Sequence, residues 1–281
     1  PTAPRTGAAI AVMCAGVLTL VLSDTVAKWL VERYHPLQIL WVRSLLACPV
    51  VAALVLATRG PSGLRSARLG VHALRGLLAA AATWCFILSL RYMALDAATA
   101  LIFSAPLFVA VLSGPLLGER VGRDRWAVIL AGFAGVLIVV RPGAAGFELA
   151  GLLALAAAAL YAVMMLVARR IPREDGFGTM TFYITAFPIL ICLPWALSPW
   201  PGGQPLDLWM FPATALCGTL GIALLSQAFR MAEAAVVAPF DYTALLWASL
   251  MGWLVWGTVP SPWTWAGAAV IAASALWLLR T

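Results

Sequence analysis

Charge is scarce in this chain, and its scarcity excludes most classes of protein. Of 281 residues, 10% are charged and 63% are hydrophobic, and the mean hydropathy is +0.98. A soluble domain carries about 25% charged residues, so this composition does not suit a water-facing surface. A membrane helix needs about 20 mostly apolar residues. The sequence therefore predicts an all-α membrane protein with no room for a soluble catalytic domain.

Histidine and cysteine are also rare, which argues against metal and disulfide chemistry. The chain has two histidines, and its five cysteines lie inside apolar stretches without paired spacing. We therefore expect no cofactor, no metal and no disulfide. No Walker-A, G-x-S-x-G or H-E-x-x-H motif occurs, so an ATP-driven pump or an enzyme is not expected. The net charge of +7 comes from scattered arginines, which does not predict nucleic-acid binding.

Apolar segments separated by charged or proline- and glycine-rich breaks predict ten transmembrane helices. They cover residues 7–30, 37–57, 71–90, 95–117, 126–140, 147–168, 178–197, 208–229, 234–256 and 263–279. With the N-terminus inside, the outer connections contain Arg33, Arg91 and Arg141. The inner connections contain Arg5, Arg59, Arg65, Arg68, Arg120, Arg123, Arg125, Arg169, Arg170, Arg173, Arg230 and Arg280. Since arginine-rich connections stay in the cytoplasm, both termini are predicted to be cytoplasmic.

An internal repeat emerges when the sequence is shifted by 139 residues. Pro49 then aligns with Pro188, and Arg91 aligns with Arg230. The first five segments superpose on the last five, which predicts one five-helix repeat over residues 1–142 and a second over 143–281. Because five is an odd number, the second repeat enters the membrane inverted. Inverted repeats are typical of secondary transporters, whose substrate site lies near the midplane between the halves.

Several short motifs resemble the EamA-type branch of the drug/metabolite transporter superfamily. They are Ser23–Lys28 followed by His35-Pro36, Ala97–Leu101, Leu117–Arg120, Gly132–Leu137 and Ala238–Tyr242. Within that superfamily the chain most resembles the bacterial amino-acid exporters. The resemblance implies a bacterial inner-membrane carrier that exports aromatic or other neutral amino acids. Related carriers of riboflavin, S-adenosylmethionine or another small metabolite are the alternative.

Three ionisable residues are expected deep in the outer half of the membrane, where charge is costly. Asp24 precedes Lys28 by one helical turn, and Arg43 lies at a similar depth in the next helix. We expect the three to meet as an outer-vestibule charge cluster. One interpretation is a structural bridge between the first two helices. The other is that the spare positive charge orients a substrate carboxylate.

Asp241 is a fourth intramembrane charge, near the inner end of its helix and just after Pro239. It is interpreted either as a proton or ammonium acceptor or as a buried structural carboxyl group. Aromatic and small polar residues at mid-depth complete the predicted substrate pocket. They are Trp84, Phe103, Ser104, Tyr161, Met164, Tyr242 and Trp247. Such a pocket suits a partly apolar solute, although aromatic residues in membrane helices more often serve packing.

Helices bent at Pro106, Pro188 and Pro239 are candidate hinges for alternating access, and static bends are the alternative. His72 and Arg75 are expected to snorkel to the cytosolic boundary. Small residues spaced four apart, such as Ala131 and Gly135, predict close helix packing within one subunit, with a dimer as the alternative. The expected partners are thus a small-molecule substrate and the lipid bilayer.

Overall fold

The computed structural model describes residues 3–118, 123–141, 148–168, 171, 175–232 and 237–278. Within these ranges the chain is helical and contains no strand. The first half contains α1 (Ala3–Leu30), α2 (Pro36–Arg59), η1 (Pro61–Leu64), α3 (Leu69–Tyr92), α4 (Leu95–Ile102), α5 (Ala105–Leu117) and α6 (Arg123–Val140). The second half contains α7 (Glu148–Ala168), α8 (Phe177–Ile191), α9 (Leu193–Ala196), α10 (Asp207–Met231), η2 (Ala238–Tyr242), α12 (Thr243–Trp256) and α13 (Pro262–Leu278).

Each of the ten expected segments coincides with one helix or with two consecutive short helices. The segment 95–117 is divided into α4 and α5, 178–197 into α8 and α9, and 234–256 into η2 and α12. Among the described residues, six stretches are long and apolar enough to cross a membrane. They are Gly7–Leu30, Pro36–Arg59, Leu69–Tyr92, Leu95–Leu116, Leu149–Ala168 and Asp207–Met231.

Helices of the first half match helices of the second half, at an offset of 139 residues, in their bounds and in the backbone conformation at their ends. Shifting α3, α5 and α6 by this offset reproduces the bounds of α10, α12 and α13 to within one residue. Gly118 and Gly257, which end α5 and α12, both adopt left-handed backbone, with φ of 72° and 66°. Met93 and Ala232, which end α3 and α10, are both extended, with ψ of 163° and 165°. The two halves therefore share one backbone plan. The proposed boundary at residues 142 and 143 lies outside the described residues.

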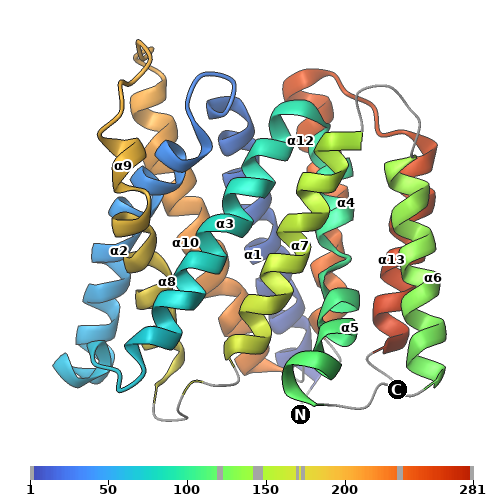
Figure 1. Ribbon diagram of the computed structural model, residues 1–281, viewed down its shortest axis with the longest axis horizontal. Helices are drawn as coiled ribbons and strands as arrows, with labels where there is room; N and C mark the ends of the chain where they lie inside the picture. The colour runs from blue at the N-terminus through green and yellow to red at the C-terminus, as the bar shows by residue number, and fades with distance from the viewer. Residues whose placement is uncertain are drawn as a thin grey trace.

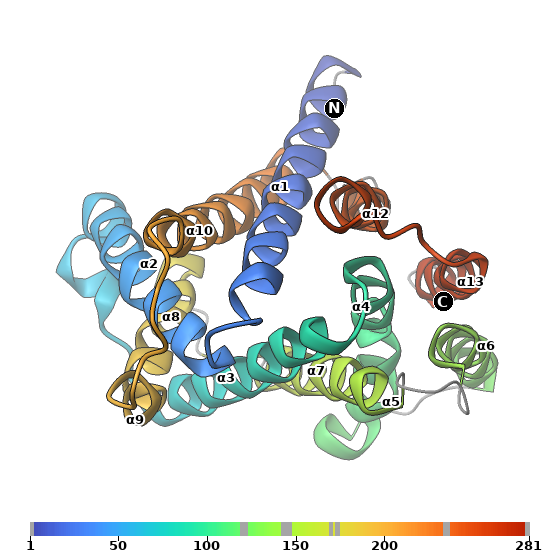
Figure 2. The ribbon, with the colours of Figure 1, turned by 90° about the horizontal axis from the view of Figure 1, so that it is seen from above.

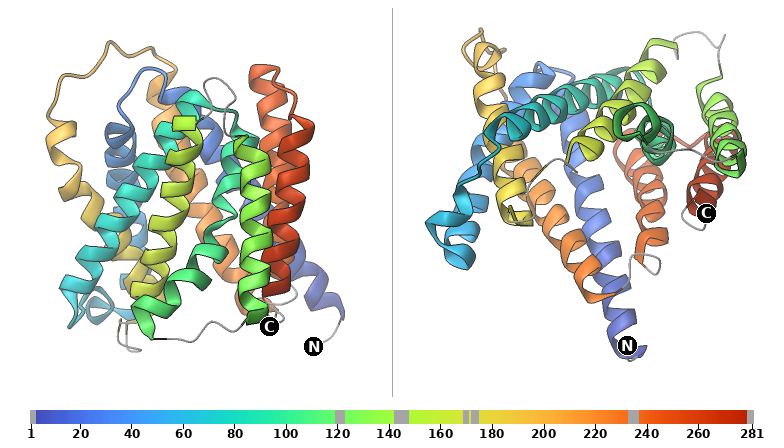
Figure 3. Two further views of the ribbon diagram at one scale, coloured as in Figure 1. Left: turned by 45° about the vertical axis from the view of Figure 1, so that its right-hand side comes forward. Right: turned by 60° about the horizontal axis from the view of Figure 1, so that its bottom comes forward.

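The helices pack in pairs, and most pairs combine one helix from each half. Helix α1 packs on α10, and its counterpart α7 packs on α3; these pairs form two opposite sides of the bundle (Figure 2). Helices α2 and α8 close one end, and α4 with α12 lie toward the other. Helices α6 and α13 form a further pair at the edge, as both views in Figure 3 show.

Corresponding helices run in opposite directions. In Figure 1, α1 rises from the lower face and α7 descends from the upper face, and the same holds for α6 and α13. Helix α1 begins and α13 ends at the lower face. This face also carries the end of α2, the start of α3 and the end of α10, where Arg59, Arg68 and Arg230 lie.

The small residues of α6 serve contacts within the chain. A Cβ atom on Gly135 would meet the carbonyl oxygen of Gly267 and the side chain of Ile271, both on α13. Likewise, a Cβ atom on Gly267 would meet the side chain of Val139 and the carbonyl oxygen of Gly135. Gly135 and Gly267 therefore let α6 and α13 approach backbone to backbone, which fits packing within one subunit, whereas Ala131 is exposed.

Candidate functional site

Two interrupted helices face each other where the halves meet. Phe103 and Ser104 separate α4 from α5, and Tyr242 joins η2 to α12. The hydroxyl of Ser104 donates to the carbonyl of Leu101 at 2.6 Å. In the other half, Thr243 donates to Phe240 at 2.7 Å. Both bonds span three residues and are related by the offset of 139, so the two breaks have the same local construction.

The aromatic rings at these breaks contact each other. The ring centroids of Phe103 and Tyr242 lie 4.7 Å apart with an interplanar angle of 40°. Trp247, one turn further along α12, packs against the same core cluster as Phe103. The structure thus brings together three of the predicted pocket residues from α4 and α12.

Ionisable groups surround this aromatic pair. Asp241 acts electrostatically on the hydroxyls of both Tyr161 and Tyr242, and Arg75 acts on that of Tyr161. At about 1.5 Å per residue, Tyr161 and Tyr242 both lie roughly 20 Å from the upper ends of α7 and α12. Ring contact and electrostatic interactions therefore connect five residues of the two halves: Arg75 on α3, Phe103 at the α4–α5 break, Tyr161 on α7, and Asp241 and Tyr242 in η2. This group of Arg75, Phe103, Tyr161, Asp241 and Tyr242 is called the inter-repeat site below.

Arg75 is one of the residues that the sequence interpretation placed wrongly. Its side chain is buried, with 3% relative exposure, rather than extended to the cytosolic boundary. Within the described part of the chain, its Nε and Nη1 atoms have no hydrogen-bond partner, and neither does the indole nitrogen of Trp247. The spacing of Arg75 from the helix end allowed snorkelling, but α3 turns the side chain inward toward α7.

Trp84 and Met164, two other predicted pocket residues, differ in where they pack. Trp84 packs on α2 and the α8–α9 junction, against Leu40 and Cys192. Met164 is buried on α7, one turn from Tyr161, and has 5% relative exposure. Trp84 therefore belongs to a separate packing cluster, which the sequence pattern alone did not distinguish from the pocket.

The expected cluster of Asp24, Lys28 and Arg43 is divided into two. Arg43 is the charged group that acts on Asp24, and its guanidinium packs against Gly218 of α10. Neither Asp24 nor Arg43 belongs to an ion pair within 4 Å among the described side chains. Lys28 points elsewhere, so the three residues do not form one site.

Lys28 binds the end of helix α3. Its ammonium group donates to the carbonyl oxygens of Leu90 and Met93 at 2.5 and 2.7 Å and lies 5.4 Å from the centre of the Trp256 ring. Asp96, buried in the first turn of α4, is a further charge acting on Lys28. A cation at a helix C-terminus satisfies carbonyl groups that have no partner in the helix. This geometry favours the structural interpretation of Lys28, and Asp96 is a partner that the sequence analysis missed.

Polar contacts join the two halves at the lower face. His72 Nε2 lies 2.9 Å from Asp175 Oδ2, and the Ser66 hydroxyl donates to the same oxygen at 2.5 Å. Burial raises the pKa of Asp175, but the bonds from Ser66 and His72 outweigh it and hold the pKa below its usual value. The His72 ring stacks on Tyr183 at 4.5 Å. This lower link connects the start of α3 to the segment before α8, so His72 is also buried rather than snorkelling.

A second polar link joins the halves at the upper face. Asp207, the first residue of α10, accepts hydrogen bonds from the Tyr34 hydroxyl at 2.9 Å and the Gln204 backbone at 2.8 Å. Arg33 pairs with Asp207 at 3.3 Å. Burial and the hydrogen bond to Asp207 raise the pKa of Tyr34. The upper and lower links each join the start of a third helix to a segment of the opposite half.

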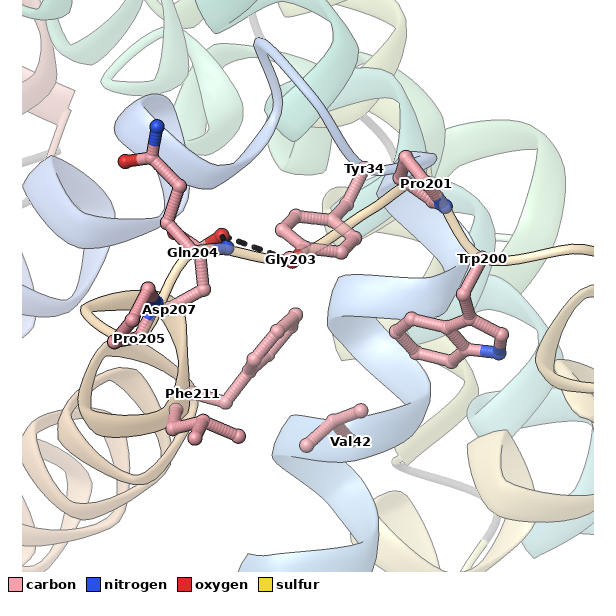
Figure 4. A pocket seen from close by; sticks show the side chains of 10 residues that line it. Tyr34, Val42, Trp200, Pro201, Gly203, Gln204, Pro205, Asp207 and Phe211 are labelled. Carbon is pink, nitrogen blue, oxygen red and sulfur yellow. Dashed lines mark hydrogen bonds between the residues drawn. The ribbon is translucent and has the colours of Figure 1, made fainter.

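Two cavities flank the upper link. One of about 530 Å³ is lined by Tyr34, Val42, Trp200, Asp207 and Phe211 among others (Figure 4). The other, of about 420 Å³, is lined by Arg33, His35, Trp195 and Trp200 among others. They share Trp200 and Pro201 and include no residue of the inter-repeat site. They form an aromatic surface at the upper face of the bundle.

The three candidate hinge prolines lie next to helix breaks. Pro106 stands in the first turn of α5, and Pro188 lies within α8 just before the junction at Cys192. Pro239 lies in η2, where only the backbone belongs to the described part of the chain. No group of three or more metal-binding side chains occurs among the described residues.

Known proteins resemble this chain over most of its length. The model of the EamA-like transporter family matches twice, at residues 7–141 and 149–280. The riboflavin transporter of Vibrio cholerae is 35% identical over 223 residues, which are 77% of this chain and 74% of that protein. The S-adenosylmethionine uptake transporter of Rickettsia bellii is 28% identical over 268 residues, covering 94% and 91%. The pseudopaline exporter of Pseudomonas aeruginosa is 27% identical over 224 residues, covering 78% and 79%.

A solved structure shares the fold. A crystal structure with 22% sequence identity matches 98% of each chain with a TM-score of 0.59. The helical bundle with two repeats defines a multi-pass membrane transporter of small molecules. The chain belongs to the EamA-like transporter family and is a protein of the bacterial inner membrane. Amino-acid export is not supported, because the relatives named above carry riboflavin, S-adenosylmethionine or pseudopaline; the alternative prediction fits better.

Proposed function

We propose that this protein is a secondary transporter of a flat, partly apolar metabolite, with riboflavin as the first candidate. The observation that carries the proposal is the contact of Phe103 with Tyr242 at the two helix breaks. Aromatic side chains bind flat ring systems by offset stacking. The substrate ring would stack on this pair, where both halves of the protein contact it.

S-adenosylmethionine is the second candidate. Relatives that take it up match almost the whole chain, and Asp241 offers a carboxylate for a sulfonium or ammonium group. Riboflavin carries no such charge, so the two candidates differ in their need for Asp241. The protein acts as a carrier rather than an enzyme in either case.

The proposed topology has ten spans, in two inverted sets of five, with the lower face and both termini in the cytoplasm. The interrupted pairs α4 with α5 and η2 with α12 each count as one span. Support comes from the opposite directions of corresponding helices and from the arginines at the lower face. Interrupted spans with midplane binding sites are a recurring feature of inverted-repeat carriers.

The position of the two links supports an alternating-access mechanism. Opening the lower face requires separation of His72 from Asp175, and opening the upper face requires separation of Tyr34 and Arg33 from Asp207. Each link joins one half to the other, so a rocking motion of the halves would break one while the other holds. Pro106, Pro188 and Pro239 remain the candidate hinges. Direction would be set by the substrate gradient.

The test is uptake by proteoliposomes that contain the purified protein. Labelled riboflavin, S-adenosylmethionine, threonine, methionine and phenylalanine are supplied separately, each with unlabelled competitor and with empty liposomes as the control. We expect saturable riboflavin uptake. Uptake of S-adenosylmethionine alone would select the second candidate, and the absence of both activities would reject the proposal.

A further inference from the structure

Arg75 is a buried cation whose Nε and Nη1 atoms have no partner among the described residues. Its side chain is 3% exposed, and neither Nε nor Nη1 makes a hydrogen bond. No ion pair includes it among the described residues. The polar groups that act on it belong to the inter-repeat site, since Tyr161 is its electrostatic neighbour and Asp241 acts on the same hydroxyl.

Burying an arginine without a hydrogen-bond or ion-pair partner costs free energy. An arginine stays protonated in proteins, so it does not escape burial by losing its charge. Buried charges are normally paired or hydrogen-bonded, and removing the partner of such a charge destabilises the fold. A structural role for Arg75 would supply that partner from the protein itself. The described residues supply no such partner, which points to a ligand that binds and dissociates.

A second donor without a partner belongs to the other half of the chain. The indole nitrogen of Trp247 is buried and has no hydrogen-bond partner among the described residues. Trp247 lies on α12, in the second half, and Arg75 lies on α3, in the first. Each half thus offers a buried hydrogen-bond donor with no partner in the described part of the chain, whereas Asp241 offers an acceptor in the inter-repeat site.

Resting on the function proposed above, we propose that Arg75 anchors the substrate by donating hydrogen bonds from its guanidinium group to acceptor atoms of the substrate. A guanidinium group presents parallel N–H donors that match a pair of neighbouring acceptors. The substrate class is therefore a flat ring system that carries carbonyl or carboxylate oxygens. The carbonyl-bearing edge of a flavin meets this requirement, and so does the carboxylate of S-adenosylmethionine.

Binding to purified protein tests the anchor directly. The dissociation constants of riboflavin and S-adenosylmethionine are measured for the wild type, Arg75→Lys and Arg75→Gln. Loss of a hydrogen bond to a charged group predicts at least tenfold weaker binding for Arg75→Gln. Arg75→Lys keeps the charge but not the paired donors, so it should fall between the two. Arg91→Gln is the matched control, because Arg91 is exposed at the far end of the same helix. Unchanged affinity in Arg75→Gln would overturn the proposal while leaving the transport function intact.

Thermal unfolding without substrate tests the anchor independently of substrate identity. An unpaired buried charge held for a ligand destabilises the empty protein, so Arg75→Met should raise the Tm. A lower Tm in Arg75→Met would show that Arg75 is structural and would also overturn the proposal. If neither compound binds the wild type but Arg75→Met has the higher Tm, riboflavin and S-adenosylmethionine are rejected as substrates, and the assignment of Arg75 as the anchor is retained.

Discussion

The rings of Phe103 and Tyr242 meet at 4.7 Å, and the two residues are separated by 139 positions, which is the offset between the two repeats. Residues related by a twofold axis touch each other only close to that axis. The contact therefore marks the axis of the repeat, and it does so at the break in each interrupted helix. A substrate held there contacts equivalent positions of both halves.

Removing either ring should impair transport. We expect Phe103→Ala and Tyr242→Ala each to lower riboflavin uptake about tenfold, because an aromatic contact and its buried area are lost. Tyr242→Phe keeps the ring and should retain most of the uptake. Phe108→Ala is the control, since Phe108 pairs with Phe133 away from the repeat axis. An equal loss in the control would mean that aromatic packing in general, rather than this pair, limits transport.

Asp241→Asn separates the two interpretations of this carboxyl group. If Asp241 binds a proton during the cycle, uptake by the variant should no longer respond to external pH. If it receives a cationic group, S-adenosylmethionine uptake should fall at least tenfold, whereas riboflavin uptake should change little. The measurement is the initial rate of uptake of both compounds between about pH 5.5 and about pH 8. Wild-type rates with an unchanged pH profile would refute both roles.

Neutralisation of Lys28 should lower stability rather than substrate recognition. Lys28→Met removes two hydrogen bonds to the carbonyls of Leu90 and Met93. Bonds to charged groups contribute about 1.5–3 kcal/mol each, so a lower Tm and a lower yield are expected. Lys28→Arg retains donors and should restore part of both. Normal Tm with weakened substrate binding in Lys28→Met would instead favour the vestibule interpretation.

The lower link should fail in acid. Because the pKa of Asp175 is below its usual value in the folded protein, its ionised form is stabilised by folding. That contribution is complete above the unfolded pKa of about 3.9 and is lost as the pH falls through the folded pKa. Tm is measured against pH for the wild type and Asp175→Asn. The variant should unfold at a lower temperature at pH 7, and the difference should shrink below about pH 4. A constant difference would show that ionisation of Asp175 is not involved.

Cysteine labelling tests the proposed topology. Ser62 and Gly202 are exposed and lie at the lower and upper faces. In a background lacking the five native cysteines, Gly202→Cys should react with an impermeant maleimide added to whole spheroplasts. Ser62→Cys should react only after the membrane is opened. Labelling of both residues in intact spheroplasts, or the reverse pattern, would contradict the cytoplasmic position of the lower face.

Most of the fold could be predicted from the sequence because hydropathy determines where helices lie in a bilayer. The expected segment 208–229 corresponds to α10 at Asp207–Met231, and 263–279 corresponds to α13 at Pro262–Leu278. The break at Phe103 was not expected, because residues 95–117 form one continuous apolar run. Hydropathy does not record where a backbone hydrogen-bond ladder is interrupted.

The candidate site was predicted only in part, because a single sequence does not show which way a side chain turns. Phe103, Tyr161 and Tyr242 were selected by depth and Asp241 as an intramembrane charge; Phe103 contacts Tyr242, and Asp241 interacts electrostatically with both tyrosines. Arg75 was assigned to the boundary from its distance along the helix, although the rotation of α3 buries it. Lys28 was assigned to Asp24 by spacing within one helix, whereas its partners lie on α3, more than sixty residues away.

Gly118 and Gly257 end equivalent helices in the same left-handed conformation, although few side chains around them agree. Duplicated halves can thus diverge in chemistry while keeping a small set of dihedral angles. A conformation of this kind costs an ordinary L-residue about 1 kcal/mol, which keeps glycine in place without any contact to substrate. The two halves of this protein therefore resemble each other more in backbone conformation than in side chains, and each half has its own set of polar groups.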